Sequence, residues 1–181
     1  MKTAKLLAAL KFASKKHASQ RRKGPGDVPY INHPIEVAEI LSRVASVEDA
    51  EILMAALLHD TVEDTDTTEA EIASLFGDHV AALVMECSDD KSLPKHERKN
   101  LQVEHAPHKT PGAKLIKIAD KISNINDIAN SPPVDWSVQR CREYLDWSER
   151  VVAGLRGENP SLDEYYDASL RAARTAFNRD A

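Results

Sequence analysis

The sequence is poor in cysteine and has no long apolar run. Its 2 cysteines, Cys87 and Cys141, lie far apart in segments with helical apolar spacing, and we expect both to be reduced and buried. No apolar stretch approaches the roughly 20 residues that a membrane span needs. The apolar N-terminal run is interrupted by Lys11, Lys15 and Lys16 before a signal-peptide pattern develops. These absences predict a cytoplasmic protein that does not bind membranes.

An excess of positive charge is absent as well. The 24 lysines and arginines are outnumbered by 29 acidic residues, which gives a net charge of −5 and argues against a binder of nucleic-acid polymers. The basic residues are nevertheless grouped into islands. Such islands are either solvated faces, the commoner case for a single lysine, or the border of a pocket for a small polyanion. The three islands are Lys15, Lys16, Arg21, Arg22 and Lys23; Lys91, Lys95, Arg98 and Lys99; and Lys114, Lys117 and Lys121.

Alternating strand patterns, internal repeats and linkers are missing too. Apolar residues recur instead at spacings of three and four, which is typical of amphipathic helices. We expect a single all-α domain of about eight to ten helices that spans residues 1–181. The expected helices are 6–17, 32–44, 46–60, 68–77, 78–87, one ended by Pro107, 110–129, 136–155 and 161–177.

Several of these helices have capping signals at their ends. The segments that begin at Thr68 and Ser161 have the spacing of a capping box, with a glutamate three residues after the hydroxyl. Ser46 and Asp78 are expected to cap the helices that follow them. Gly77 is expected to end the helix before it.

The most informative segment is the run from Ala55 to Asp64. Four apolar residues lead directly into His59-Asp60, and Glu63-Asp64 follows one turn later. On a continuous helix these side chains would project from adjoining stripes of one surface. Burying unpaired carboxylates is strongly unfavourable, and a metal ion is the simplest partner for them. The segment therefore predicts that His59 and Asp60 bind a common ion.

Two further ligands can be proposed from the sequence. Asp120 is the only acid in the apolar segment 115–122, although it could also pair with Lys117 or Lys121. His33 lies at a helix start between Asn32 and Pro34, and a histidine in such a position is by itself more often a satisfied structural residue. Together with His59 and Asp60 they would form a nitrogen and oxygen set without thiolate. That set suits Mn²⁺, Fe²⁺ or catalytic Zn²⁺ and leaves positions open for water and substrate.

The ordered set of His33, His59-Asp60 and Asp120 resembles the HD-domain metal-dependent phosphohydrolases, which fold as helical bundles. The sequence around these residues is similar to that of the hydrolase domain of the Rel/SpoT alarmone enzymes. It is especially similar to the small stand-alone alarmone hydrolases related to the metazoan SpoT homologue. The matching segments are 30–34, 57–65, 93–95, 114–124 and 144–147, and the resemblance extends from about residue 8 to 157.

This resemblance implies a specific reaction and specific roles. The family binds one Mn²⁺ and removes the 3′-pyrophosphate of ppGpp or pppGpp, which yields GDP or GTP and pyrophosphate. It implies that His33, His59, Asp60 and Asp120 bind the metal, and that Glu63 and Asp64 position and deprotonate the attacking water. The residues that it implies for phosphate, sugar and base contacts are Arg22, Lys23, Lys95, Asn124, Arg140 and Tyr144.

Two other functions remain open at the level of sequence. One is a related phosphatase on the same scaffold, such as one that removes the 2′-phosphate of NADPH. The other is a nucleotide-binding module without activity, which the complete ligand set disfavours. In each case the expected partner is a small-molecule nucleotide, and the expected oligomeric state is a monomer.

Overall fold

The computed structural model of the chain describes residues 2–178, which form ten α-helices, one 3-10 turn and no strand. The expectation of an all-α fold is confirmed. Within this range, no helix is long and apolar enough to cross a membrane. The elements are α1 (Lys2–Lys16), α2 (Asn32–Arg43), α3 (Ala50–Leu58), α4 (Thr61–Asp64), α5 (Glu69–Phe76), α6 (Asp78–Cys87), α7 (Lys95–His105), η1 (Ala106–His108), α8 (Pro111–Asn130), α9 (Val138–Ala153) and α10 (Pro160–Asn178).

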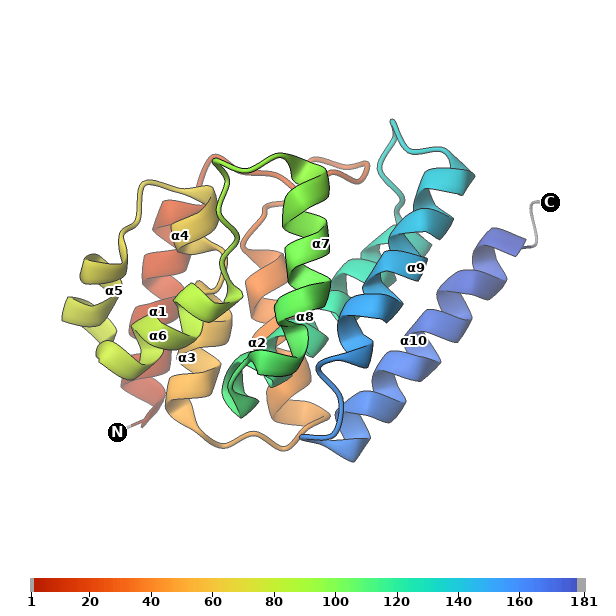
Figure 1. Cartoon of the computed structure of the whole chain (residues 1–181). Coiled ribbons are helices and arrows are strands. Elements are labelled where there is room, and N and C mark those ends of the chain that lie inside the picture. The colour runs from red at the N-terminus through yellow and green to blue at the C-terminus, as the bar shows by residue number, and fades with distance from the viewer. Residues whose placement is uncertain (1, 179–181) are drawn as a thin grey trace.

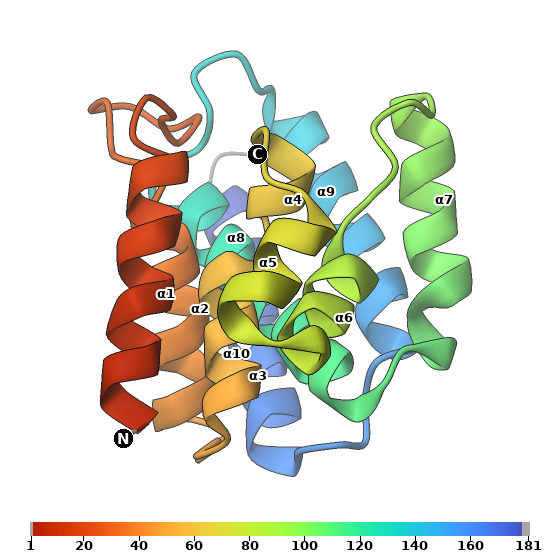
Figure 2. The ribbon, with the colours of Figure 1, turned by 90° about the vertical axis from the view of Figure 1, so that its left-hand side faces the viewer.

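Two helices organise the core. Helix α8 packs against α2, α6, α9 and α10, and α3 packs against α1, α2 and α6. Figure 2 shows α1 and α7 on opposite sides of the molecule, with these helices between them. The segments 17–31, 88–94 and 131–137 meet at the same end of the molecule as α4 (Figures 1 and 2). Loops from distant parts of the sequence therefore surround one end of the bundle.

Helix α8 is apolar along most of its length but carries polar groups into the interior. Pro111 occupies its first turn, as expected for a residue without a backbone N–H. Ile116, Ile118, Ile122 and Ile125 are fully buried, and several polar neighbours in the same helix are buried as well. These buried polar residues are Lys117, Asp120, Lys121 and Ser123. Burial of so many polar groups in one helix marks it as part of a site.

The structure confirms the hydroxyl cap of the first expected capping box, whose Glu71 carboxylate pairs with Lys16 instead of Thr68, and it corrects the second. The hydroxyl of Thr68 accepts a hydrogen bond from the backbone N–H of Glu71, as expected. The last helix is capped instead by Asn159, whose Oδ1 accepts from the N–H of Leu162. Ser161 is already inside that helix and exposed to solvent, so it cannot provide the cap.

Two other expected caps are also wrong. Ser46 has a φ of +53° and lies outside any helix. Asp49 caps α3 instead, because its carboxylate accepts from the N–H of Glu51. Asp78 is the first residue of α6, and Gly77, which ends α5 as expected, occupies the capping position before it.

The expected helix 46–60 is interrupted at its functional end. Helix α3 stops at Leu58, and the chain continues through His59 and Asp60 into the single turn of α4. The hydroxyl of Thr61 donates to the carbonyl of Leu58 at 2.7 Å. Such a side-chain bond competes with the helical ladder at this point. The break separates the histidine–aspartate pair from Glu63 and Asp64, which lie beyond it on α4.

Candidate metal centre and its cleft

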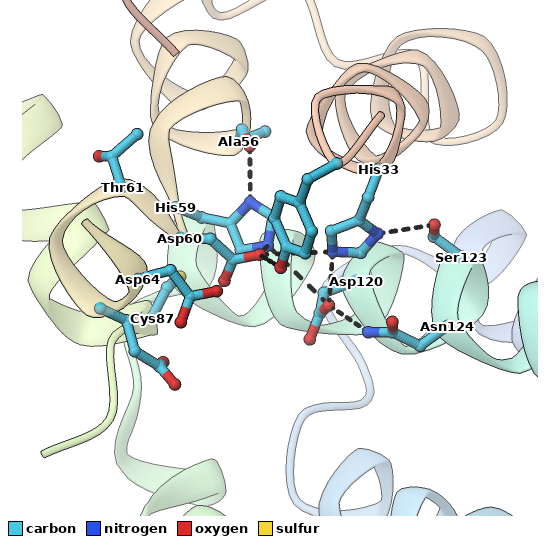
Figure 3. Close-up of polar contacts among 12 residues, drawn as sticks. His33, Ala56, His59, Asp60, Thr61, Asp64, Cys87, Asp120, Ser123 and Asn124 are labelled. Carbon is cyan, nitrogen blue, oxygen red and sulfur yellow. Dashed lines mark hydrogen bonds and ion pairs between the residues drawn. The ribbon is translucent and has the colours of Figure 1, made fainter. Parts of the chain in front are cut away.

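Four side chains from three parts of the fold converge beneath the loop end of the bundle. His33 comes from the start of α2, His59 and Asp60 from the α3–α4 junction, and Asp120 from the middle of α8 (Figure 3). Ligand atoms of the first three lie within 4.8 Å of one another. Oδ1 of Asp120 lies 3.2 Å from Nε2 of His33 and 3.9 Å from Nε2 of His59. The structure thus brings together all four residues expected to bind a metal.

A hydrogen bond orients the ring of His59 toward this point. Nδ1 of His59 lies 2.8 Å from the carbonyl oxygen of Ala56, an acceptor, so Nδ1 must carry the proton. Nε2 of His59 is buried and makes no hydrogen bond with any residue that the structure describes. It lies 3.2 Å from Oδ2 of Asp60 without forming a hydrogen bond, and a buried nitrogen in this position is costly unless it holds a proton or a metal ion. Together with one more imidazole and two carboxylates, it fits a site for a divalent transition metal.

The local charges keep both carboxylates ionised. Burial alone would raise the pKa of Asp60, but His59 beside it holds that pKa below its ordinary value. Burial opposes ionisation of Asp120 in the same way, and Lys121 and Lys117 hold its pKa well below the ordinary value. Both carboxylates therefore carry the negative charge that a cation site requires.

The two histidines differ in their protonation. Burial lowers the pKa of His33 below its ordinary value. Burial acts in the same direction on His59, but the adjacent carboxylate of Asp60 outweighs it and raises the pKa of His59 to about 8. Without a metal, the imidazole of His59 therefore carries a second proton near neutral pH.

Further side chains hold the two carboxylates in place. The hydroxyl of Tyr30 donates to Oδ2 of Asp60 at 2.5 Å. The amide of Asn124 donates to Oδ1 of Asp120 at 2.6 Å, and Nζ of Lys121 lies 3.1 Å from Oδ2 of Asp120. Tyr30 had no role predicted from the sequence, although this residue begins the matching segment 30–34. Its position three residues before His33 was the available signal for a role in the site.

Glu63 and Asp64 lie next to the metal centre on the wall of a cleft. Oε2 of Glu63 accepts from the backbone N–H of Asp89 at 3.0 Å, and Asp64 pairs with Lys91. Burial raises the pKa of Glu63 above its ordinary value. A carboxylate of this kind is better suited to accept a proton near neutral pH than a fully solvated one.

The cleft has a volume of about 1020 Å³, and its lining residues include members of the loops at 17–31, 88–94 and 131–137. All six residues expected to contact substrate line it, namely Arg22, Lys23, Lys95, Asn124, Arg140 and Tyr144. Eight basic side chains line it in total, in a chain whose net charge is −5. The eight are Arg21, Arg22, Lys23, Lys91, Lys95, Arg98, Lys99 and Arg140. This concentration of positive charge suits a small polyanion.

Several of these cations have no acidic partner. Within residues 2–178, Lys23, Lys95 and Lys99 make no ion pair. Burial and the nearby Arg140 lower the pKa of Lys95, and burial and Lys95 lower that of Lys99. By contrast, Arg22 is engaged, because Nε donates to Asp127 at 2.8 Å and Nη2 to Asn124 at 2.9 Å.

Aromatic rings form another part of the cleft wall. The ring of Tyr144 lies 5.7 Å from that of Trp136 and 5.3 Å from that of Trp147, between ring centroids. Nζ of Lys99 lies 4.5 Å from the ring centroid of Trp147. Rings next to cations can contact a planar base and its phosphates together. Of these aromatic residues, only Tyr144 was predicted from the sequence. Trp147 ends the matching segment 144–147, one helical turn after Tyr144, and this spacing was the signal available for it, whereas Trp136 lies outside the matching segments.

The third basic island of the sequence divides between two environments. Nζ of Lys117 and Nζ of Lys121 lie 3.7 Å and 3.1 Å from Oδ2 of Asp120. Lys114 points elsewhere and pairs with Glu158 at 3.1 Å. Asp120 therefore has the lysine partners that the sequence offered as an alternative role, and it also faces the two histidines.

Comparison with known proteins agrees with this geometry. A family model of the HD domain matches residues 9–145. Guanosine-3′,5′-bis(diphosphate) 3′-pyrophosphohydrolase MESH1 of Homo sapiens is 56% identical over 161 residues, covering 89% of this chain and 90% of the human protein. The protein of the same name from Danio rerio is 54% identical over 162 residues, covering 90% of each.

A solved structure extends the likeness to three dimensions. It is that of a metazoan ortholog of SpoT that hydrolyses ppGpp, and it superposes on this chain with a TM-score of 0.90 at 47% identity. The alignment covers 93% of this chain and 94% of the other. The chain therefore belongs to the HD-domain family and, within it, to the group of the MESH1 proteins.

Proposed function

We propose that this chain is a metal-dependent hydrolase that removes the 3′-pyrophosphate of ppGpp and pppGpp, leaving GDP or GTP. The observation that carries the proposal is the convergence of two histidines and two aspartates next to a cleft lined by eight cations, with Glu63 and Asp64 on its wall. Tyr30 and Asn124, which line the cleft, donate hydrogen bonds to the two aspartates. The relatives named for this activity cover about nine tenths of the chain. In this proposal the protein acts as a monomer in the cytoplasm, and its partner is the nucleotide.

His33, His59, Asp60 and Asp120 would bind the metal. We expect Mn²⁺, and the same donor set accepts Fe²⁺ or Zn²⁺, because imidazole and carboxylate bind all three. A divalent ion supplies Lewis-acid chemistry: it polarises a phosphoryl oxygen and lowers the pKa of water. Tyr30, Asn124 and Lys121 would keep the two carboxylates oriented toward it.

Glu63 and Asp64 would act on the attacking water. A carboxylate can hold a water molecule by accepting its hydrogen bond and can remove its proton as attack proceeds. The raised pKa of Glu63 supports a role in accepting that proton. The ion pair with Lys91 and the hydrogen bond from Asp89 hold the two carboxylates in place.

The cations of the cleft would bind the two pyrophosphates of the substrate. Arginine offers bidentate donors to phosphate oxygens, and lysine offers a compact charge. Lys23 and Lys95 have no acidic partner among the described residues and are therefore available to a ligand. Arg140 and Tyr144 lie beside Trp136, where a base and a phosphate could be bound together.

The direct test is pyrophosphate release from ppGpp in the presence of Mn²⁺. We expect Asp64→Ala to reduce kcat by at least about 100-fold, since a positioned acid–base group contributes about 10²- to 10⁴-fold. Asp66→Ala is the matched control, because Asp66 lies two residues away with its side chain 87% exposed. Intact ppGpp after prolonged incubation of the wild-type protein with Mn²⁺ would contradict the proposal.

The same assay separates the alternative phosphatase activity. Parallel reactions with ppGpp and NADPH, with products resolved by chromatography, give the specific activity on each. Pyrophosphate as the main product supports the proposal. A higher activity on NADPH with release of free phosphate would favour the alternative.

A further inference from the structure

His33, Ser123 and Glu36 form a hydrogen-bonded chain of three side chains. Ser123 and Glu36 lie on the side of His33 that faces away from the metal centre. Nδ1 of His33 lies 2.9 Å from Oγ of Ser123, and Oγ of Ser123 lies 2.8 Å from Oε2 of Glu36. His33 and Glu36 are one turn apart on α2, and Ser123 is on α8, which packs against α2. Figure 3 shows His33 between Ser123 on one side and the carboxylates on the other.

The direction of each hydrogen bond follows from the chemistry of the three groups. A carboxylate can only accept, and a serine hydroxyl has one proton to donate. The hydroxyl of Ser123 must therefore donate to Glu36, and its oxygen accepts the proton on Nδ1 of His33. This assignment leaves Nε2 of His33 as a lone pair directed at the metal centre. The tautomer that a metal requires is thus already set.

Burying the polar groups of this hydrogen-bonded chain, here called the relay, costs free energy, and packing alone does not require polar groups at these positions. Ser123 is fully buried, and the carboxylate of Glu36 is half-buried. Glu36 makes no ion pair with any other residue of the described range. A small apolar residue could fill the position of Ser123 without leaving a hydroxyl to be satisfied. Nδ1 of the other histidine, His59, faces the backbone carbonyl of Ala56 and bonds to no side chain among residues 2–178.

We propose that Glu36 and Ser123 are positioning residues for the metal ligand His33. They fix its ring and its tautomer, and the negative charge at the end of the relay makes Nε2 a stronger ligand. Outer partners of this kind typically change metal affinity by about 10- to 100-fold when they are removed. The inference rests on the metal site of the proposed function and concerns metal affinity, not the identity of the substrate.

The test is calorimetric titration of Mn²⁺ into metal-free protein. We expect Ser123→Ala to weaken Mn²⁺ binding by about 10- to 100-fold. Glu36→Gln retains an oxygen acceptor but loses the charge, so we expect a smaller weakening, of at least about threefold. Glu39→Gln is the matched control, because it makes the same change on the same helix at a surface residue that pairs with Arg43. We expect the control to leave Mn²⁺ affinity unchanged.

Two further measurements distinguish positioning from a general structural role. Unfolding temperatures of the metal-free variants should match the wild type within a few degrees. Nitrogen NMR of the histidine rings should show His33 protonated at Nδ1 in the wild type and a mixture of tautomers in Ser123→Ala. At saturating Mn²⁺, the Ser123→Ala variant should regain most of the wild-type kcat.

The proposal is overturned if Ser123→Ala binds Mn²⁺ within twofold of the wild type while remaining folded. If Ser123→Ala does not fold, Glu36→Gln decides alone, because it is nearly isosteric at a half-buried position. Failure of the proposed function has a different signature. In that case the variants show the changes in Mn²⁺ affinity described above, and the wild type releases no pyrophosphate from ppGpp.

Discussion

His33 and His59 illustrate how neighbours give one residue type two different properties. Both rings are buried, and burial lowers the pKa of an imidazole. His33 follows this rule, whereas the carboxylate of Asp60, 3.2 Å from Nε2 of His59, raises the pKa of His59 to about 8. In the absence of metal, His59 is therefore the histidine that takes up a second proton near neutral pH.

This difference predicts that metal binding depends on pH. A metal binds the neutral imidazole, so below pH 8 it must displace the proton of His59. We expect the apparent affinity for Mn²⁺ to fall by up to about tenfold for each pH unit between pH 8 and pH 6. Titrations at several pH values, in buffers with different ionisation enthalpies, would also show release of close to one proton at pH 7.

The control for this prediction is an exposed histidine. His96→Gln removes an imidazole from the surface of α7 and should leave the profile unchanged. An affinity that is constant between pH 6 and pH 8 would mean that His59 is already neutral in the metal-free protein.

The helices differ in how far the sequence predicts them. Helix α8 could be located from its apolar spacing and its Thr110-Pro111 start, and Asp120 stood out as the single acid of an apolar segment. The break between α3 and α4 could not be predicted, because residues 55–64 are compatible with a continuous helix. It depends on the bond from Thr61 to the carbonyl of Leu58 and on the packing of the polar side chains that follow.

The start of α10 shows a related limit. Ser161 and Glu164 have capping-box spacing, but the observed cap is Asn159. The amide of Asn159 also donates to the carbonyl of Ala45 at 3.0 Å, which lies 114 residues away in the sequence. A tertiary contact thus selects one of two local possibilities, and no local pattern reveals it.

This correction leads to a prediction about stability. We expect Asn159→Ala to lower the free energy of unfolding by about 1 kcal/mol, typical of a lost N-cap, and the unfolding temperature by about 2–4 °C. Ser161→Ala should have no measurable effect, since its side chain makes no hydrogen bond with residues 2–178 and is exposed. Thermal unfolding of the two variants measures the difference. An equal or larger loss of stability in Ser161→Ala would mean that Ser161 caps the helix after all.

The cleft belongs to the scale of the whole molecule, because its walls come from segments far apart in the chain. Family resemblance indicated six residues for substrate contacts and the pair Glu63 and Asp64 for the attacking water, and all eight line the cleft. The contacts of Lys99 with Trp147 and of Tyr30 with Asp60 were not predictable, since spacing along a helix says nothing about which distant segment it will face. Local patterns therefore indicated the four side chains that converge at the candidate metal centre, but not the contacts around them.

The distribution of charge is also a property of the whole molecule. Eight of the 24 basic residues line one cleft of a protein whose net charge is −5. Lys99 is half-buried there, without an acidic partner in the described part of the chain, and burial and Lys95 lower its pKa. A bound polyanion would relieve this repulsion between like charges.

This arrangement predicts that catalysis depends on ionic strength. Salt screens the attraction between the cleft and a polyanion, so we expect kcat/KM for ppGpp to fall by about tenfold between roughly 50 and 300 mM KCl, mainly through KM. Lys99→Met should raise KM at low salt by about tenfold, the loss of one charge-assisted hydrogen bond, and should flatten the salt dependence. Its unfolding temperature should not fall, because the substitution removes repulsion with Lys95. Lys114→Met, a lysine outside the cleft that pairs with Glu158, should retain the wild-type salt dependence. An unchanged KM in Lys99→Met would place the phosphates elsewhere in the cleft.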